Sequence, residues 1–347
     1  MGSEMCIRDS LHRLPLEDRQ THFIDAHPTN MPEHSFEPIH GKIERFSFSS
    51  AKLKNQLGDP TQREIMVHIP PNDGHALPCI IYLAPYTGTG FGRANWKPFA
   101  ETLPQRHERL VREGKMKPAI LVMPDTFTSL GGNQFIDSEI MGNWGQWLKT
   151  DLKDEISRRY NVSGFGLVGK SSGGYGALVR GMIDDCWSAV ACHSGDCGFE
   201  LIFGIEMASA MSHISEFGDK DAFLEHVKSC NSLSGEDFHT LMIIAMAASF
   251  SDGEMPVDEN CNFIEEKWSE WKAFDPLSMI ETYHNLPPCW IDVGNQDQYN
   301  IQYGLRQLHS RMEELGIEHV WEEFPGTHSG IDHRLDLSLP WIANQIE

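Results

Sequence analysis

The feature of the sequence that most constrains its fold is a series of short, unbroken apolar runs separated by stretches with helical spacing. The runs occupy residues 79–84, 119–123, 165–168, 189–192 and 289–293. Unbroken apolar runs are typical of strands that are covered on both faces, and their alternation with helices indicates right-handed crossovers between parallel strands. The sequence therefore predicts an α/β fold with a mostly parallel central sheet flanked by helices.

Other segments are predicted to form further strands of this sheet and the helices that flank it. Phe46 and Phe48 recur at every second position, as do Ile65, Val67 and Ile69, which is the pattern of strands with one buried face. Residues 319–324 are expected to form the last strand. The predicted helices lie at 96–114, 144–160, 173–184, 302–315 and 338–346.

The chain divides into an arm, an interrupted α/β domain and an insertion. Residues 1–40 are predicted to form a polar N-terminal arm, of which 1–10 are interpreted as a sequencing artefact or a disordered end. The α/β domain comprises 41–198 and 289–347. Residues 199–288 show helical spacing without a strand and are far longer than an ordinary crossover, so they form a helical insertion. This insertion is interpreted as a lid over the carboxyl ends of the strands, in preference to a structural elaboration or an oligomer surface.

Charge and composition exclude several classes of partner. The formal net charge of −22 would repel nucleic acids and anionic membrane surfaces, because binding either needs a basic patch. The sequence contains neither an apolar run of roughly 18 to 20 residues nor a secretory signal, so a cytoplasmic protein without membrane partners is expected. The 8 cysteines are scattered, which favours reduced core residues over disulfides. Oligomeric state is left open.

The segment 165–178 carries the strongest chemical signal. An apolar run leads into Gly169-x-Ser171-x-Gly173, and a predicted helix follows. This pattern is typical of a sharp strand-to-helix turn that exposes a nucleophilic serine, and glycines are needed because larger side chains would collide there. Ser171 is the expected nucleophile.

The same residues also satisfy a phosphate-binding pattern, Gly164-x-x-x-x-Gly169-Lys170-Ser171. A phosphate loop must follow a buried strand, whereas polar residues precede Gly164 and the apolar run lies inside the supposed loop. The nucleophile turn is therefore favoured over a nucleotide site.

A serine nucleophile needs a base and an acid that orients it. His328 lies in a glycine-bearing loop just after the last predicted strand, and it is favoured over its neighbour His333. The acid is expected after residues 289–293, where Asp297 lies in a loop and Asp292 within the strand. A loop carboxylate can turn toward the histidine, so Asp297 is favoured over Asp292.

The oxyanion of an acyl-transfer intermediate needs two N–H donors. The Ser172 amide begins the helix after the nucleophile and is the first expected donor. The second is expected from the small-residue loop 84–90, at Tyr86 or Thr87.

Together these segments resemble the esterase family that includes esterase D-type, enterochelin esterase-like and antigen 85-type proteins. The stretches that carry the resemblance are Gly58-Asp-Pro, Tyr82 to Gly90, Val122-Met-Pro-Asp, Gly169 to Leu178, Cys192-His-Ser-Gly-Asp and Gly326-Thr-His. They span residues 41–347 except the insertion. The loop 84–90 lacks the Leu-Thr-Cys-Thr element of formylglutathione hydrolases, which argues against a glutathione thioester substrate.

The resemblance implies an α/β-hydrolase fold and a serine esterase acting on a small-molecule ester, with a triad of Ser171, Asp297 and His328. It implies neither a metal nor an organic cofactor. An acyltransferase of the antigen 85 type and a catalytically silent binding module remain as alternatives. Phe199, Met207, Met211, Met242, Trp268 and Trp271 of the insertion line an acyl pocket or pack the core, and core packing is favoured.

Overall fold

The computed structural model describes residues 36–347, so most of the expected arm 1–40, including 1–10, lies outside the described residues. Residues 38–97 and 101–347 form one compact unit, which holds every helix and strand of the described chain. Of the other described residues, 36–37 and 98–100 belong to a second unit.

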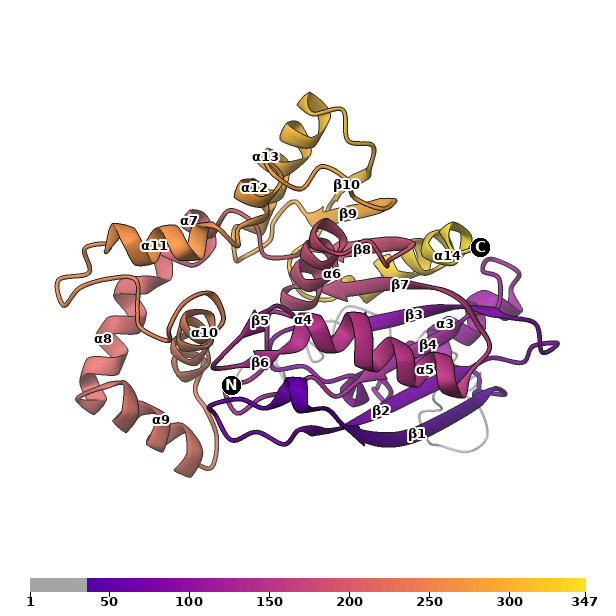
Figure 1. Cartoon of the computed structure of the whole chain (residues 1–347), viewed down its shortest axis with the longest axis horizontal. Helices are drawn as coiled ribbons and strands as arrows, with labels where there is room; N and C mark the ends of the chain where they lie inside the picture. Colours follow the sequence, from indigo (N-terminus) through magenta and orange to yellow (C-terminus); the bar gives the residue numbers. More distant parts are fainter. Residues whose placement is uncertain (1–35) are drawn as a thin grey trace, which may run out of the picture. The chain divides into compact units, whose positions relative to one another are not determined.

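An eight-stranded sheet forms the centre of the larger unit, in the order β1-β2-β4-β3-β7-β8-β9-β10 (Figure 1). β1 and β2 pair antiparallel, β2 pairs antiparallel with β4, and the other neighbours pair parallel. Its strands are β1 (Lys42–Ser49), β2 (Gln62–Ile69), β3 (Leu77–Leu83), β4 (Ile120–Pro124), β7 (Val162–Lys170), β8 (Ala189–His193), β9 (Cys289–Gly294) and β10 (Val320–Phe324). The predicted mostly parallel sheet is confirmed, and each of its strands overlaps a segment expected from the sequence.

The burial of the strands follows their place in the sheet. Every residue of β3, β4, β8 and β9 is buried, because helices cover both faces of the sheet there. The edge strand β1 has no residue in the buried class. Unbroken apolar runs thus correspond to inner strands, and the alternating segments to β1 and β2 at the antiparallel end of the sheet.

The helices that flank the sheet are α3 (Leu103–Arg112), α4 (Trp144–Gln146), α5 (Lys153–Arg159), α6 (Ser172–Ile183), α13 (Ile301–Glu314) and α14 (Leu335–Gln345). A π-helical turn, Trp147–Leu152, joins α4 to α5, so the predicted helix 144–160 is nearly continuous. The prediction of a helix from residue 96 was wrong in its start. Thr102 caps α3 through a reciprocal pair of hydrogen bonds with Gln105, which fixes the first turn at Leu103.

Between β8 and β9 the described chain is helical. Its α-helices are α7 (Phe199–Ile202), α8 (Met207–Phe217), α9 (Lys220–Ser229), α10 (Gly235–Phe250), α11 (Glu265–Lys272) and α12 (Pro276–Met279). In Figure 1, α8 to α11 gather to the left of the sheet. Strand pairing in this segment is limited to one isolated bridge between Val257 and Phe263. Whether residues 199–288 act as a separate lid stays a prediction.

Short elements complete the described chain. β5 (Asp137–Ser138) and β6 (Gly142–Asn143) form a separate two-stranded sheet. Single turns of 3₁₀ helix lie at Ala51–Leu53, Phe91–Arg93, Gly204–Glu206 and Ile331–Arg334. None of the helices between residues 36 and 347 is long and apolar enough to cross a lipid bilayer.

Candidate active site

Ser171 lies in a strained turn between β7 and α6. Its φ of 57° and ψ of −127° are rarely adopted by a residue with a side chain. The turn is tight enough that a Cβ on Gly169 would lie 2.2 Å from the Gly173 carbonyl oxygen, and a Cβ on Gly173 would lie 2.1 Å from the Leu83 oxygen. Only glycine fits at both positions, which gives the glycine spacing its physical cause.

The phosphate-loop alternative does not fit the structure. The residues that would form the loop, from Gly164 to Lys170, belong to β7 and pair with β3 and β8. A paired strand cannot wrap its N–H groups around a phosphate.

His328 and Asp297 lie in the loops that follow β10 and β9. The His328 Nδ1 is 2.7 Å from the Asp297 Oδ2, and both side chains are buried. The other carboxylate oxygen of Asp297 accepts a hydrogen bond from the Tyr299 amide, and the His328 amide donates to Gln298. With Nδ1 held by the carboxylate, Nε2 is the ring nitrogen left for a reacting group.

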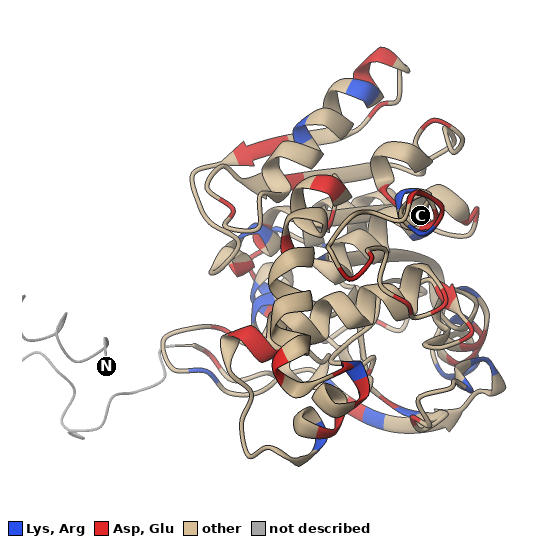
Figure 2. Cartoon of the chain, turned by 90° about the vertical axis from the view of Figure 1, so that its left-hand side faces the viewer, with Lys and Arg blue, Asp and Glu red and all other residues tan. Residues whose placement is uncertain are grey.

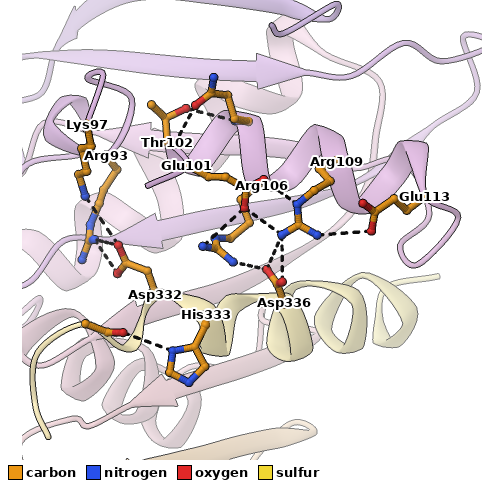
Figure 3. A network of polar contacts seen from close by, with 12 residues as sticks. Arg93, Lys97, Glu101, Thr102, Arg106, Arg109, Glu113, Asp332, His333 and Asp336 are labelled. Carbon is orange, nitrogen blue, oxygen red and sulfur yellow. Dashed lines mark hydrogen bonds and ion pairs between the residues drawn. The ribbon is translucent and has the colours of Figure 1, made fainter. Parts of the chain in front are cut away.

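The competing candidates lie elsewhere. His333 is exposed, and its Nδ1 contacts the Gly330 carbonyl oxygen (Figure 3). Asp292 is fully buried and pairs with His193, 2.7 Å away, and with Arg334. Neither residue lines the pocket beside Ser171.

Ion pairs anchor the segment that follows His328 (Figure 3). Arg93 contacts both oxygens of Asp332 at 2.8 and 2.9 Å. Arg106 and Arg109, both on α3, contact Asp336 at the start of α14. These contacts hold the chain after the His328 loop against α3 and the 3₁₀ turn at Phe91–Arg93.

The expected oxyanion residues Ser172, Tyr86 and Thr87 all line the same pocket as Ser171 and His328. The Thr87 amide donates to the Gly131 carbonyl at 2.7 Å, so it is already engaged. The Tyr86 amide has no hydrogen-bond partner among residues 36–347, and its hydroxyl donates to Leu130. Of the two alternatives from this loop, Tyr86 therefore has the free donor.

The pocket has a volume of about 450 Å³ and two kinds of wall. The loops at the carboxyl ends of the strands supply the residues just described. The helical segment 199–288 supplies the opposite wall, with Ile202, Phe203, Ile205, Glu206, Gly235, Phe238, His239 and Met242. Of the insertion residues considered as acyl-pocket candidates, Met242 alone lines this pocket. Phe199, Met207, Trp268 and Trp271 are buried in the hydrophobic core, as favoured from their spacing.

Sequence reasoning missed three charged residues of this pocket, Lys170, Asp196 and Glu206. Lys170 immediately precedes Ser171, and Asp196 follows the carboxyl end of β8. Burial raises the pKa of Asp196 to about 7, and the charge of Asp297 adds to the rise. The position of Asp196 after a parallel strand was the available signal, because ligands of α/β sheets bind at that edge.

The described residues do not supply the ligand set that a metal ion needs. Residues 36–347 contain no group of three or more His, Cys, Asp or Glu side chains placed to hold a metal ion.

No family model and no curated protein sequence matches this chain. Solved structures do match its fold. A ferulic acid esterase has a TM-score of 0.53 at 16% identity, with 89% of this chain and 100% of that chain covered. The fluorophosphonate-binding serine hydrolase F of Staphylococcus aureus has a TM-score of 0.56 at 13% identity, with 88% of this chain and 99% of that chain covered. An S-formylglutathione hydrolase from Agrobacterium tumefaciens has a TM-score of 0.57 at 15% identity, with 90% of this chain and 98% of that chain covered. The chain thus has the α/β-hydrolase fold, which it shares with serine esterases, as the sequence resemblance implied.

Proposed function

We propose that this chain is a serine esterase that hydrolyses small-molecule carboxylic esters through an acyl-Ser171 intermediate. Ser171 is the nucleophile, His328 the general base and acid, and Asp297 the group that orients His328. The amides of Ser172 and Tyr86 stabilise the oxyanion.

The observation that carries the proposal is the placement of Ser171 and the His328–Asp297 pair at one pocket. The nucleophile turn and the 2.7 Å contact between His328 Nδ1 and Asp297 come from segments far apart in the sequence. A silent binding module has no need of a strained serine beside such a pair.

The reaction proceeds in two steps. Ser171 Oγ attacks the ester carbonyl and gives its proton to His328 Nε2, and His328 then protonates the departing alcohol as the carbonyl–oxygen bond breaks. Water next attacks the acyl-enzyme, with His328 removing its proton, and the acid leaves as Ser171 regains a proton.

The test is intact-mass analysis after incubation with a fluorophosphonate, on the wild type and on Ser171→Ala. A single adduct on the wild type that is absent from Ser171→Ala is the expected result, and hydrolysis of p-nitrophenyl acetate should accompany it. An unlabelled but well-folded wild type would contradict the proposal.

A further inference from the structure

Asp196 is a buried carboxylic acid at the catalytic pocket that the proposed reaction does not use. It lies just beyond β8, with 7% of its surface exposed, and it lines the pocket together with Ser171 and His328. Its side chain therefore faces the space where a substrate must sit.

The polar neighbours of Asp196 are neutral. Its carboxyl group receives hydrogen bonds from Ser172 and Gln134. The Gln134 Nε2 also lies 3.0 Å from the Ser172 Oγ, and the Gln134 Oε1 is buried without a partner among the described residues. These contacts hold the Asp196 carboxyl group in place but supply no positive charge.

No Lys, Arg or His of residues 36–347 forms an ion pair with Asp196, and the one charge that raises its pKa is that of Asp297. Tyr175, Cys192 and Cys197 also lie near it, but burial raises the pKa of each well above its usual value, so they stay neutral. Lys170 instead interacts with Asp332, Asp297 and the cations Arg93 and Lys97.

Burying a carboxylate without a cationic partner costs free energy. A ligand that brings a cation to Asp196 would supply that partner and gain binding free energy from the ion pair. The aromatic side chains of Phe203, Phe238 and Tyr299 line the same pocket and suit a cation as well. The net charge of −22 attracts cationic molecules from solution, and Figure 2 shows Asp and Glu spread over many elements rather than in one patch.

We propose, resting on the function proposed above, that Asp196 is a specificity-determining residue that binds a protonated amine of the ester substrate. The substrate class is thus an ester that carries an aliphatic amine in its acyl or alcohol part. The ammonium group donates a hydrogen bond to the Asp196 carboxylate while Ser171 attacks the ester carbonyl.

The proposal predicts a preference that depends on pH. Asp196 must be ionised to bind the ammonium group, and its pKa of about 7 places that change near neutrality. The preference is therefore about half developed near pH 7, close to full at pH 8, and lost as Asp196 becomes protonated at lower pH. Because both esters of a pair are cleaved by the same Ser171, the ratio of their rates isolates the effect of the amine.

Two pairs of shape-matched esters test the preference, one for each part of the substrate. For the acyl part, p-nitrophenyl 4-(aminomethyl)benzoate is compared with p-nitrophenyl 4-ethylbenzoate. For the alcohol part, 2-(dimethylamino)ethyl benzoate is compared with 3-methylbutyl benzoate. The wild type should favour the amine in at least one pair by about tenfold or more in kcat/KM at pH 8, and by much less at pH 5.5.

Asp196→Asn keeps the shape of the side chain and should bring the ratio close to one at both pH values. Glu206→Gln is the matched control, because Glu206 lines the same pocket but is 30% exposed and pairs with His239. Glu206→Gln should keep most of the preference for the amine ester. Fluorophosphonate labelling of Asp196→Asn shows whether its active site is intact.

A wild-type ratio near one for both pairs would overturn the Asp196 proposal and leave the esterase proposal standing. An equal loss in Glu206→Gln would also overturn it, since the general field would then explain the preference. If Ser171 is not labelled and no ester is cleaved, the esterase proposal fails by itself. Amine binding is then tested separately by thermal denaturation at pH 8. Benzylamine should raise the Tm of the wild type but not that of Asp196→Asn, and benzyl alcohol should raise neither. If benzylamine does not raise the Tm of the wild type, the Asp196 proposal is overturned.

Discussion

Residues 36–347 bring a serine, a histidine and an aspartate to one place twice, and the two sets differ in what surrounds them. In the first, Asp297 contacts His328 beside Ser171 at the pocket. In the second, His193 Nδ1 is 2.7 Å from Asp292 and His193 Nε2 is 2.8 Å from the Ser338 Oγ.

The second set is sealed inside the protein. Ser338 and Asp292 have 0% of their surface exposed, and His193 has 2%. Asp292 also accepts hydrogen bonds from Arg334 and from Trp290. Ser338 lies within α14 and is not placed on a strained turn. The set ties β8, β9 and α14 together.

Hydrogen-bond geometry alone therefore does not identify a catalytic triad. The first set has a serine in a strained turn, the free amide of Tyr86 nearby and a pocket of about 450 Å³, whereas the second has neither space nor a strained serine. We expect substitutions in the first set to change rates and those in the second to change stability.

The largest expected effect is on the rate when Ser171 is replaced. Ser171→Ala should lower kcat for p-nitrophenyl esters by at least about 10⁴-fold, because no acyl-enzyme can form. Ser338→Ala should keep the rate of the wild type and lose about 1–3 kcal/mol of unfolding free energy, since it leaves a buried imidazole nitrogen without a partner. Steady-state kinetics and urea denaturation measure both. A slow Ser338→Ala with a fast Ser171→Ala would reverse the assignment.

The next effect concerns the orienting acid. Asp297→Asn should lower kcat by about 10³- to 10⁴-fold, because the amide favours the wrong tautomer of His328. The loss of stability should be small, since the side chain keeps its shape. The measurement is kcat for p-nitrophenyl acetate with a circular dichroism melt. A mutant as fast as the wild type would move the acid role to another carboxylate.

Asp292→Asn should act on stability instead, with a loss of about 3–5 kcal/mol at pH 7, because a buried ion pair loses one partner. Burial alone would raise the pKa of Asp292, but His193, Trp290 and Arg334 together lower it below 3.8. A lowered pKa stabilises the fold above the unfolded value and loses that contribution as pH falls through the folded value. Urea titrations at pH 7 and pH 3 should therefore show a smaller difference from the wild type at pH 3.

The smallest effect is expected at Asp196, where the substitution should raise the stability of the protein instead of lowering it. Its pKa is raised from 3.8 to about 7, so the fold loses stability as pH rises through that interval. Asp196→Asn removes this loss and should stabilise the protein by about 1–3 kcal/mol above pH 7 and by almost nothing at pH 4. Thermal denaturation at both pH values measures it. A mutant that is less stable at pH 8 would show that the ionised carboxylate supports the fold.

The strands could be predicted because their signal is local. Runs such as 79–84 and 189–192 contain no polar residue that could face water, so each implies a covered strand. The start of α3 was predicted too early, because the capping contact between Thr102 and Gln105 outweighs the apolar pattern before it. The helical character of residues 199–288 was visible from spacing, but which of its side chains would reach the pocket was not.

What the sequence determined by itself is the nucleophile turn, because Gly169 and Gly173 act on Ser171 within a few residues. The order of segments also favoured His328 and Asp297, but tertiary structure alone decided the rest of the pocket. Tertiary structure engaged the Thr87 amide with Gly131, placed Asp196 in the pocket with no ion-pair partner among residues 36–347, and gave the His193–Asp292 pair a sealed interior. These outcomes depend on distances and burial between residues far apart in the chain, and no local pattern encodes such distances.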